Sequence, residues 1–98
     1  MKSLIASFLV LSSLSAYSQN LKKGAQLYGT CIQCHGEKGM GNVEQKAPRI
    51  AGQHDWYVYT QLVNFKAKKR QNEKMYPFIV NLSDQDYKDL AAFVSQLK

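Results

Sequence analysis

The residues best suited to chemistry lie in one short segment, the sequence CIQCH at positions 31–35. It holds both cysteines of the 98-residue chain, and His35 follows the second cysteine directly. Two thiols and an imidazole at this spacing can bind zinc, exchange thiols for a disulfide, or attach a haem covalently. The rest of the sequence has to decide among these three chemistries.

Zinc binding and thiol exchange both need features that the sequence lacks. A structural zinc site takes four ligands, typically from a second Cys or His pair, and outside CIQCH only His54 remains. A thioredoxin-like C-x-x-C motif belongs to an alternating strand–helix pattern, which is absent here. C-x-x-C-H is the attachment sequence of c-type haem. We therefore expect one covalently attached haem c, with thioether bonds to Cys31 and Cys34 and with His35 as an iron ligand.

Residues 1–18 have the layout of a secretory signal. A basic start with Lys2 precedes an apolar stretch over residues 4–14, and small residues at positions 16 and 18 fit a peptidase site. The stretch is too short and too rich in serine for the roughly 20 apolar residues of a transmembrane helix. The sequence predicts a cleaved signal peptide over 1–18 and one domain over 19–98, exported to the periplasm without stable membrane insertion.

The iron has a second axial position, for which the sequence offers three candidates. Met40 lies only five residues after His35, so a loop from there would have to wrap around the haem edge almost at once. His54 adjoins the start of a predicted helix and would give a bis-histidine iron. Met75 lies in a long irregular segment, and Pro77 keeps that segment from continuing as a regular helix. We favour Met75 as the distal ligand, with His54 or an open iron site as the alternatives.

Helical periodicity is present in three segments, and no segment alternates as a strand would. The first covers residues 21–33 with Asn20 as its N-cap. The second runs from about Asp55 to Lys68, and the third begins at Ser83, where Asp86 completes a capping-box pattern. The sequence thus predicts an all-α fold with the haem at the centre of its core. The apolar stripes are Leu21, Ala25, Tyr28 and Ile32, then Val58, Leu62 and Phe65, then Tyr87, Leu90, Val94 and Leu97.

Nearly all of the predicted domain resembles class I c-type cytochromes, in particular small bacterial monohaem cytochromes and the single-haem halves of two-haem bacterial cytochromes. The matching stretches are GAQLYGTCIQCHGEKGMGN, APRIAGQHDWYVYTQLVNF and KMYPFIVNLSDQDYKDLAAFVSQL. The resemblance implies a compact fold in which three main helices and their loops wrap around one covalent haem. It also implies thioether bonds at Cys31 and Cys34 and axial ligands at His35 and Met75.

Further contacts are implied by the same resemblance. The Pro48 carbonyl would accept a hydrogen bond from the His35 ring, a common way of orienting a ligating imidazole. Gly24 and Phe93 would meet where the first and last helices cross, which would explain a glycine that costs about 1 kcal/mol relative to alanine inside a helix. The candidates for contacts to the haem or its propionates, with ordinary packing or surface charge as the alternative, are Trp56, Tyr57, Tyr59, Arg49 and Arg70.

The charge of the chain bears on its partners. The formal net charge is +6, and +5 once Lys2 is removed with the signal. No nucleic-acid recognition motif is present, so we expect no nucleic acid partner. Electrostatic docking to redox proteins with acidic faces is the better interpretation. The strongest basic run, which could also be a solvated helix end, is Lys66, Lys68, Lys69 and Arg70.

The predicted function is one-electron transfer by a monomeric protein that is not itself an enzyme. Outside the haem, no constellation of catalytic base and nucleophile is visible, and two filled axial positions leave no site for a substrate. One alternative is a haem subunit or domain of a larger oxidoreductase. Another is an open-site haem enzyme or sensor, which would require that Met75 is not an iron ligand.

Overall fold

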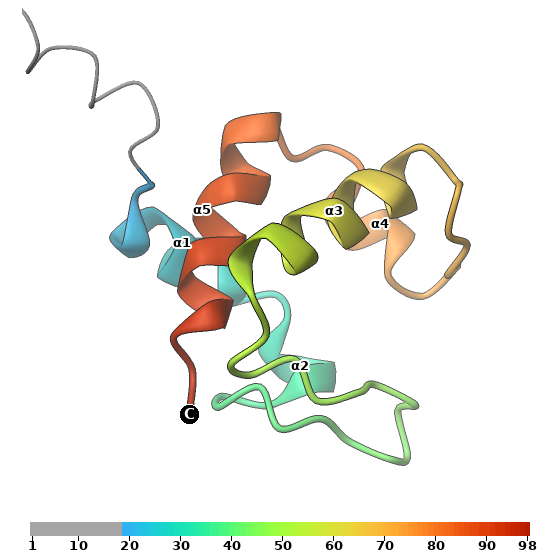
Figure 1. Ribbon diagram of the computed structural model, residues 1–98. Coiled ribbons are helices and arrows are strands. Elements are labelled where there is room, and N and C mark those ends of the chain that lie inside the picture. The colour runs from blue at the N-terminus through green and yellow to red at the C-terminus, as the bar shows by residue number, and fades with distance from the viewer. Residues whose placement is uncertain (1–18) are drawn as a thin grey trace, which may run out of the picture.

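The computed structural model describes residues 19–98, so the predicted signal peptide over 1–18 lies outside the described residues. This part of the chain contains no strand, only an isolated antiparallel bridge between Asn42 and Ala47. It also contains no helix that is long and apolar enough to cross a membrane. The predicted all-α class is confirmed. The helices are α1 (Leu21–Tyr28), α2 (Ile32–His35), α3 (Asp55–Lys66), α4 (Tyr76–Ile79) and α5 (Asp84–Ser95) (Figure 1).

The C-terminal helix α5 lies between α1 and α3 and packs against both (Figure 1). Its start is the predicted capping box, in which the Ser83 hydroxyl accepts from the Asp86 amide at 3.0 Å and the Asp86 carboxylate accepts from the Ser83 amide at 3.1 Å. These bonds satisfy two amides that a helix start otherwise leaves without partners. The predicted stripe is buried at Tyr87, Leu90 and Val94, so α5 supplies much of the hydrophobic core.

A glycine sets the closest approach between α1 and α5. A Cβ atom on Gly24 would overlap the backbone carbonyl oxygen of Asp89 and lie 2.8 Å from Phe93 Cβ. The predicted meeting of Gly24 and Phe93 at the crossing of the first and last helices is therefore confirmed. The ring of Tyr28, one turn further along α1, lies 5.5 Å from the Phe93 ring between centroids. The start of α1 is also fixed to α5, because the Asn20 amide donates to the buried Asp89 carboxylate at 2.9 Å.

The first predicted helix is wrong in its length and in its buried face. Residues 21–33 do not form one helix, because α1 ends at Tyr28 and a turn separates it from α2. Of the predicted stripe only Tyr28 is buried, whereas Leu21, Ala25 and Ile32 are exposed. The reason is steric, because the face of α1 that carries Gly24 is the one that can approach the α5 backbone closely.

The second predicted helix forms as α3, with Leu62 and Phe65 buried and Val58 half-buried against the same core. It ends at Lys66, two residues before the predicted end. Lys68 has a left-handed backbone with φ of 60°, which stops the helix and turns the chain.

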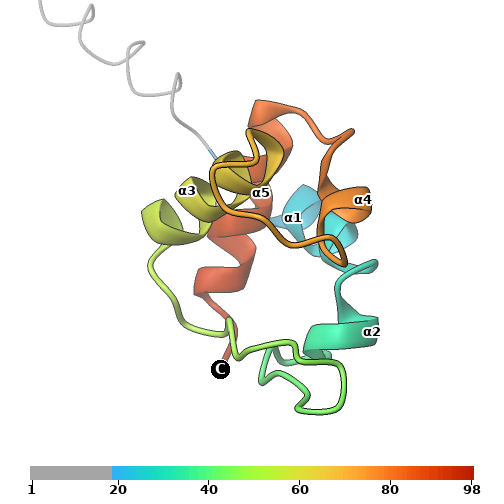
Figure 2. The same ribbon diagram turned by 90° about the vertical axis from the view of Figure 1, so that its right-hand side faces the viewer.

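The segment from 67 to 75 leads into the short helix α4. Pro77 lies in the first turn of α4, where its missing amide would have had no helical partner. The sequence predicted an irregular segment here, and the structure differs because Pro77 starts a helical turn as readily as it breaks one. The buried Tyr87 hydroxyl donates to the Ile79 carbonyl at 2.6 Å, which fastens the end of α4 to α5. In both ribbon views α4 lies above α2 and the loop of residues 36–54 (Figure 2).

Candidate functional site

The CIQCH segment forms a single helical turn. The backbone carbonyl of Cys31 accepts from the His35 amide at 2.9 Å and, more weakly, from the Cys34 amide at 3.3 Å. Because residues three apart on a helical turn share a side, both thiols face the same way. Both cysteines are free and half-buried. The turn therefore presents two thiols together, with the imidazole immediately after them.

The state of the Cys31 thiol argues against a redox dithiol. Burial raises the pKa of the Cys31 thiol and the nearby Cys34 raises it further, while a hydrogen bond with Thr30 acts in the opposite direction. Dithiol oxidoreductases need a lowered thiol pKa, because the thiolate is their nucleophile. The raised pKa of the Cys31 thiol is thus in line with covalent attachment rather than thiol exchange.

His35 is buried and oriented by one backbone carbonyl. Its Nδ1 atom lies 2.9 Å from the Pro48 carbonyl oxygen, and the residue is 6% exposed. A carbonyl can only accept a hydrogen bond, so Nδ1 carries a proton, and in the neutral ring the lone pair then lies on Nε2. The contact that the resemblance implied is present. A neutral imidazole with Nδ1 held in this way and Nε2 free to bind is the form that an iron ligand requires.

The loop after α2 folds back tightly enough to bring Pro48 to His35. Gly41 donates its amide to the His35 carbonyl at 2.9 Å, and Asn42 and Ala47 exchange two backbone hydrogen bonds. Gly41 has φ of +89°, and a Cβ atom there would lie 2.7 Å from the Ala47 carbonyl oxygen. Only glycine fits such a position, so the glycines of this loop have a geometric role in placing Pro48.

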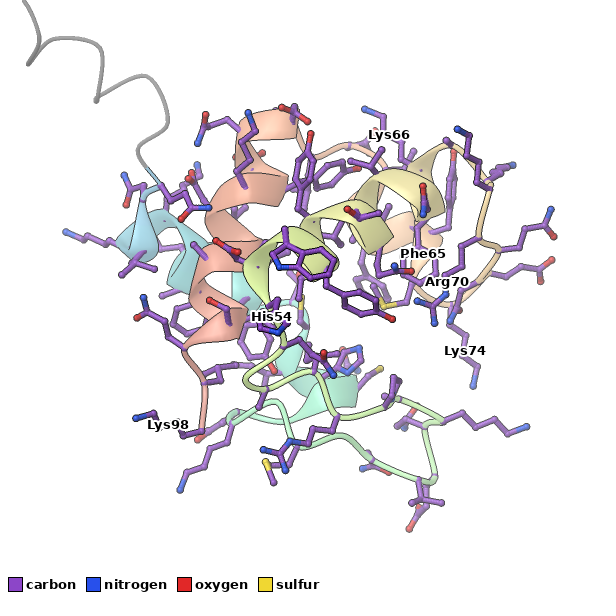
Figure 3. The ribbon with its side chains drawn as sticks, in the orientation of Figure 1. His54, Phe65, Lys66, Arg70, Lys74 and Lys98 are labelled. Carbon is purple, nitrogen blue, oxygen red and sulfur yellow. The ribbon has the colours of Figure 1, made fainter. Side chains whose placement is uncertain are left out.

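The three candidates for the distal ligand lie in different surroundings. Met75 is half-buried and packs against the hydrophobic core. Met40 is 51% exposed in the loop after α2. His54 is exposed at the start of α3, where its ring stacks on Trp56 with centroids 5.5 Å apart (Figure 3). Among the three, Met75 alone is packed against the core.

The candidates for propionate contacts are spread over several surfaces. Trp56 and Tyr57 are exposed, and the Tyr59 hydroxyl donates to the Asp84 carboxylate at 2.5 Å. Arg70 donates to the Gln61 side chain at 2.7 Å, and its guanidinium lies 4.8 Å from the centroid of the Phe65 ring. Arg49 is exposed.

The first and last residues of the basic run point in different directions. Figure 3 shows Lys66 on the opposite side of the α3 end from Arg70. The Lys66 ammonium lies 6.0 Å from the centroid of the Tyr87 ring, toward α5. The left-handed backbone at Lys68 lies between these two residues and changes the direction of the chain. The sequence analysis missed Lys74, which extends on the same side as Arg70 (Figure 3).

Sequence reasoning also missed Asn72, whose side chain accepts hydrogen bonds from the backbone amides of Lys74 and Met75. The available signal was an asparagine shortly before a short helix, since Asn side chains often accept from amides two or three residues further on.

Comparisons with known proteins agree with this geometry. Residues 21–98 match the family model for cytochrome c. Cytochrome c4 of Thiocapsa roseopersicina is 42% identical over 69 residues, which cover 70% of this chain and 35% of that relative. The chain spans half or less of the length of the first two curated relatives that it matches.

Two solved structures share the fold. The reduced recombinant cytochrome c4 from Pseudomonas stutzeri matches with a TM-score of 0.73 at 27% identity, over 80% of this chain and 48% of that chain. A thiosulfate dehydrogenase from Marichromatium purpuratum matches with a TM-score of 0.77 at 26% identity, over 81% of this chain and 19% of that chain. The helical turn with two free thiols and the oriented imidazole fit the cofactor of these proteins. The chain therefore belongs to the cytochrome c family and carries its covalently bound haem c.

Proposed function

We propose that this protein is a periplasmic one-electron carrier with a haem c that is bound to His35 and Met75. When bound, the haem supplies the one-electron couple between ferric and ferrous iron. The observation that carries the proposal is the hydrogen bond between His35 Nδ1 and the Pro48 carbonyl oxygen at 2.9 Å. It supports His35 as a ligand because, in the neutral ring, it places the lone pair on Nε2 and helps to fix the orientation of the ring.

The α2 turn would anchor the cofactor. The Cys31 and Cys34 thiols would each form one thioether bond, and their shared side of the turn suits two attachments to one planar group. Since His35 follows in the same turn, its imidazole would be held close to the attached group and would supply one iron ligand. The Pro48 carbonyl holds the ring proton on Nδ1 and thereby makes the other nitrogen a better donor to the metal.

Met75 would bind the iron on the opposite face. A thioether favours ferrous iron and so raises the potential relative to a second imidazole. Its packing against the core supports this role, because a half-buried side chain has fewer alternative positions than the exposed Met40. With both axial positions filled by protein side chains, substrate and oxygen have no open position, which supports a carrier rather than an enzyme.

Partner recognition would rest on positive charge. Arg70 and Lys74 extend from the segment between α3 and α4, the same segment that leads to Met75 (Figure 3). We propose that this side faces acidic redox proteins, with no role for nucleic acid. The carrier would act as a monomer outside the cytoplasm, as the signal layout of residues 1–18 supports.

Extraction with acid and acetone tests the covalent attachment. The proposal predicts that the haem stays with the protein and that a peptide containing CIQCH carries the mass of one haem. Potentiometric titration of the holoprotein should then fit a single one-electron step. Haem that leaves with the organic phase would overturn the attachment at Cys31 and Cys34.

A haem domain or subunit of a larger oxidoreductase is the second candidate. The structural match to a thiosulfate dehydrogenase favours it. Size-exclusion chromatography of a native extract separates the two candidates. A carrier elutes alone and exchanges electrons with added partners, whereas a subunit elutes together with an enzyme.

A further inference from the structure

Asn72 makes three hydrogen bonds to the backbone around Met75. Its side-chain Oδ1 accepts from the amides of Lys74 at 3.0 Å and Met75 at 3.2 Å. Its backbone carbonyl accepts from the Tyr76 amide at 3.0 Å. One residue therefore fixes three consecutive amides, and the amide of Met75 is the middle one.

The chain on the other side of Met75 is fixed independently. The Met75 carbonyl accepts from the Phe78 amide at 2.9 Å, which begins α4. The other end of α4 is fastened to α5 by the bond from the buried Tyr87 hydroxyl to the Ile79 carbonyl. Met75 thus lies between a helical turn anchored in the core and a turn that depends on the Asn72 side chain.

The start of the segment before Met75 is held by the Lys69 and Arg70 amides, which donate to the Asn64 carbonyl at 2.9 and 3.2 Å, but residues 71–74 have little besides Asn72 to order them. Residues 66–74 are all exposed, so burial of apolar surface cannot hold this backbone in place. The Lys68 ammonium lies 4.9 Å from the centroid of the Tyr76 ring, a surface contact that does not involve the Met75 backbone. Exposed segments with few apolar contacts open at low free energy unless hydrogen bonds restrain them. Asn72 supplies that restraint directly beside Met75.

We propose that Asn72 is a positioning residue for the Met75 thioether. Its side chain holds the backbone so that the sulfur stays at one place relative to the core. The inference rests on the proposed function, in which Met75 binds the iron. A side chain that must compete with water and added ligands binds better when the chain that carries it is already ordered.

The test compares matched variants of the complete holoprotein. Asn72→Ala removes the side-chain acceptor, and Asn72→Leu removes it while nearly keeping the size of the side chain. Asn72→Asp keeps an oxygen at the accepting position. The control is Asn20→Ala, because the Asn20 side chain also accepts from a backbone amide three residues further on, that of Lys23 at 2.9 Å, but does so at the start of α1.

Two spectroscopic readouts report on the bond between Met75 and ferric iron. They are the intensity of the methionine-to-iron charge-transfer band and the rate of cyanide binding. We expect Asn72→Ala and Asn72→Leu to weaken the band and to speed cyanide binding about tenfold, since loss of the restraint raises the population of the locally open segment. Asn72→Asp and Asn20→Ala should both keep the band and the cyanide rate of the parent.

A denaturant titration separates positioning from general stability. In Asn72→Ala the band should disappear at a lower denaturant concentration than the helical signal, whereas in Asn20→Ala the two should disappear together. Parent-like cyanide rates in Asn72→Ala would overturn the inference and leave Met75 as the ligand. If that variant yields no folded holoprotein, parent-like rates in Asn72→Leu would overturn it equally. A parent protein without the band would overturn the ligand assignment, and this inference with it.

Discussion

At the scale of single residues, polar side chains set the geometry of this protein through specific partners. The His35–Pro48 contact could be predicted only through the resemblance to class I c-type cytochromes, which implies this partner for the imidazole of CIQCH. The partners of Asn72 and Tyr59 could not, because each hydrogen bond depends on where a loop or a neighbouring helix comes to lie. Sequence spacing predicts residues that share one turn, but it does not predict which exposed side chains meet across two elements.

The contact between Tyr59 and Asp84 has a consequence for titration. The hydrogen bond from Tyr59, and then the Lys88 ammonium at 3.4 Å, hold the pKa of the Asp84 carboxyl below its ordinary value. Tyr59→Phe removes the larger cause, so the Asp84 pKa should rise toward the ordinary value. A carbon-detected NMR titration of the Asp84 carboxyl measures this shift directly.

The same change affects stability with a definite sign. A lowered carboxyl pKa in the folded state stabilises the protein above the unfolded pKa, and this contribution is lost as the pH falls through the folded pKa. The loss in free energy of unfolding that Tyr59→Phe causes through Asp84 should therefore be largest near neutral pH. It should shrink below about pH 4. Tyr57→Phe, on the same helix, is the control and should leave the Asp84 pKa unchanged. An unchanged pKa in Tyr59→Phe would show that the contact does not form in solution.

At the scale of elements, the helices that carry their own boundary signals were predicted best. The start of α5 follows from its capping box, and α3 follows from its stripe of Leu62 and Phe65. The predicted helix over residues 21–33 was wrong, because the buried face of α1 is decided by the contact of Gly24 with the α5 backbone. Helical periodicity is read from apolar side chains. It therefore misses a helix face that is buried because a glycine leaves it without a side chain.

The crossing of α1 and α5 should not tolerate a methyl group at Gly24. The added Cβ of Gly24→Ala would overlap the Asp89 carbonyl oxygen and crowd Phe93, so the helices would have to separate. We expect the free energy of unfolding to fall by about 1–3 kcal/mol through overpacking, even after the gain of up to about 1 kcal/mol in helix propensity. Chemical denaturation of the holoprotein measures the difference.

Gly29→Ala is the matched control for this prediction. Gly29 has φ of −51° at the end of α1, and its nearest neighbour to an added Cβ is the Gln26 carbonyl oxygen at 3.2 Å. This substitution should change stability by less than about 1 kcal/mol. Equal stability of Gly24→Ala and the parent would show that α1 and α5 lie further apart than described.

At the scale of the whole molecule, one domain carries a net positive charge and presents two basic side chains beside the segment that leads to Met75. The net charge could be read from the sequence, but its distribution could not. Lys66 follows the helical face toward α5, whereas Arg70 and Lys74 follow the turn that begins at Lys68 (Figure 3). The directions of Arg70 and Lys74 therefore depend on that left-handed residue, whereas that of Lys66 depends on α3.

Charge reversal tests the proposed docking side. Arg70→Glu with Lys74→Glu should slow second-order electron transfer with an acidic redox protein at low salt. The difference should shrink toward physiological salt, where the Debye length is about 8 Å, and above. Stopped-flow kinetics across a salt series measure the rates, and the potential of each variant is checked separately.

The control for this prediction changes the net charge equally. Lys22→Glu with Lys23→Glu places the same reversals on the exposed part of α1. If docking is local, this control should slow the reaction much less than the Arg70 and Lys74 pair. Equal slowing by both pairs would mean that only the overall charge matters, and equal rates for the parent and both pairs would exclude electrostatic docking.

The central claim is that the covalent haem has two protein ligands, His35 and Met75, and therefore carries electrons without binding substrate. The most direct measurement is carbon monoxide binding to the ferrous holoprotein, together with the methionine-to-iron charge-transfer band of the ferric form, in the parent, Met75→Ala and Met40→Ala. The parent and Met40→Ala should show the band and resist carbon monoxide. Met75→Ala should lose the band, bind carbon monoxide readily and have a lower potential. A parent that binds carbon monoxide, or a band that survives in Met75→Ala and vanishes in Met40→Ala, would contradict the claim.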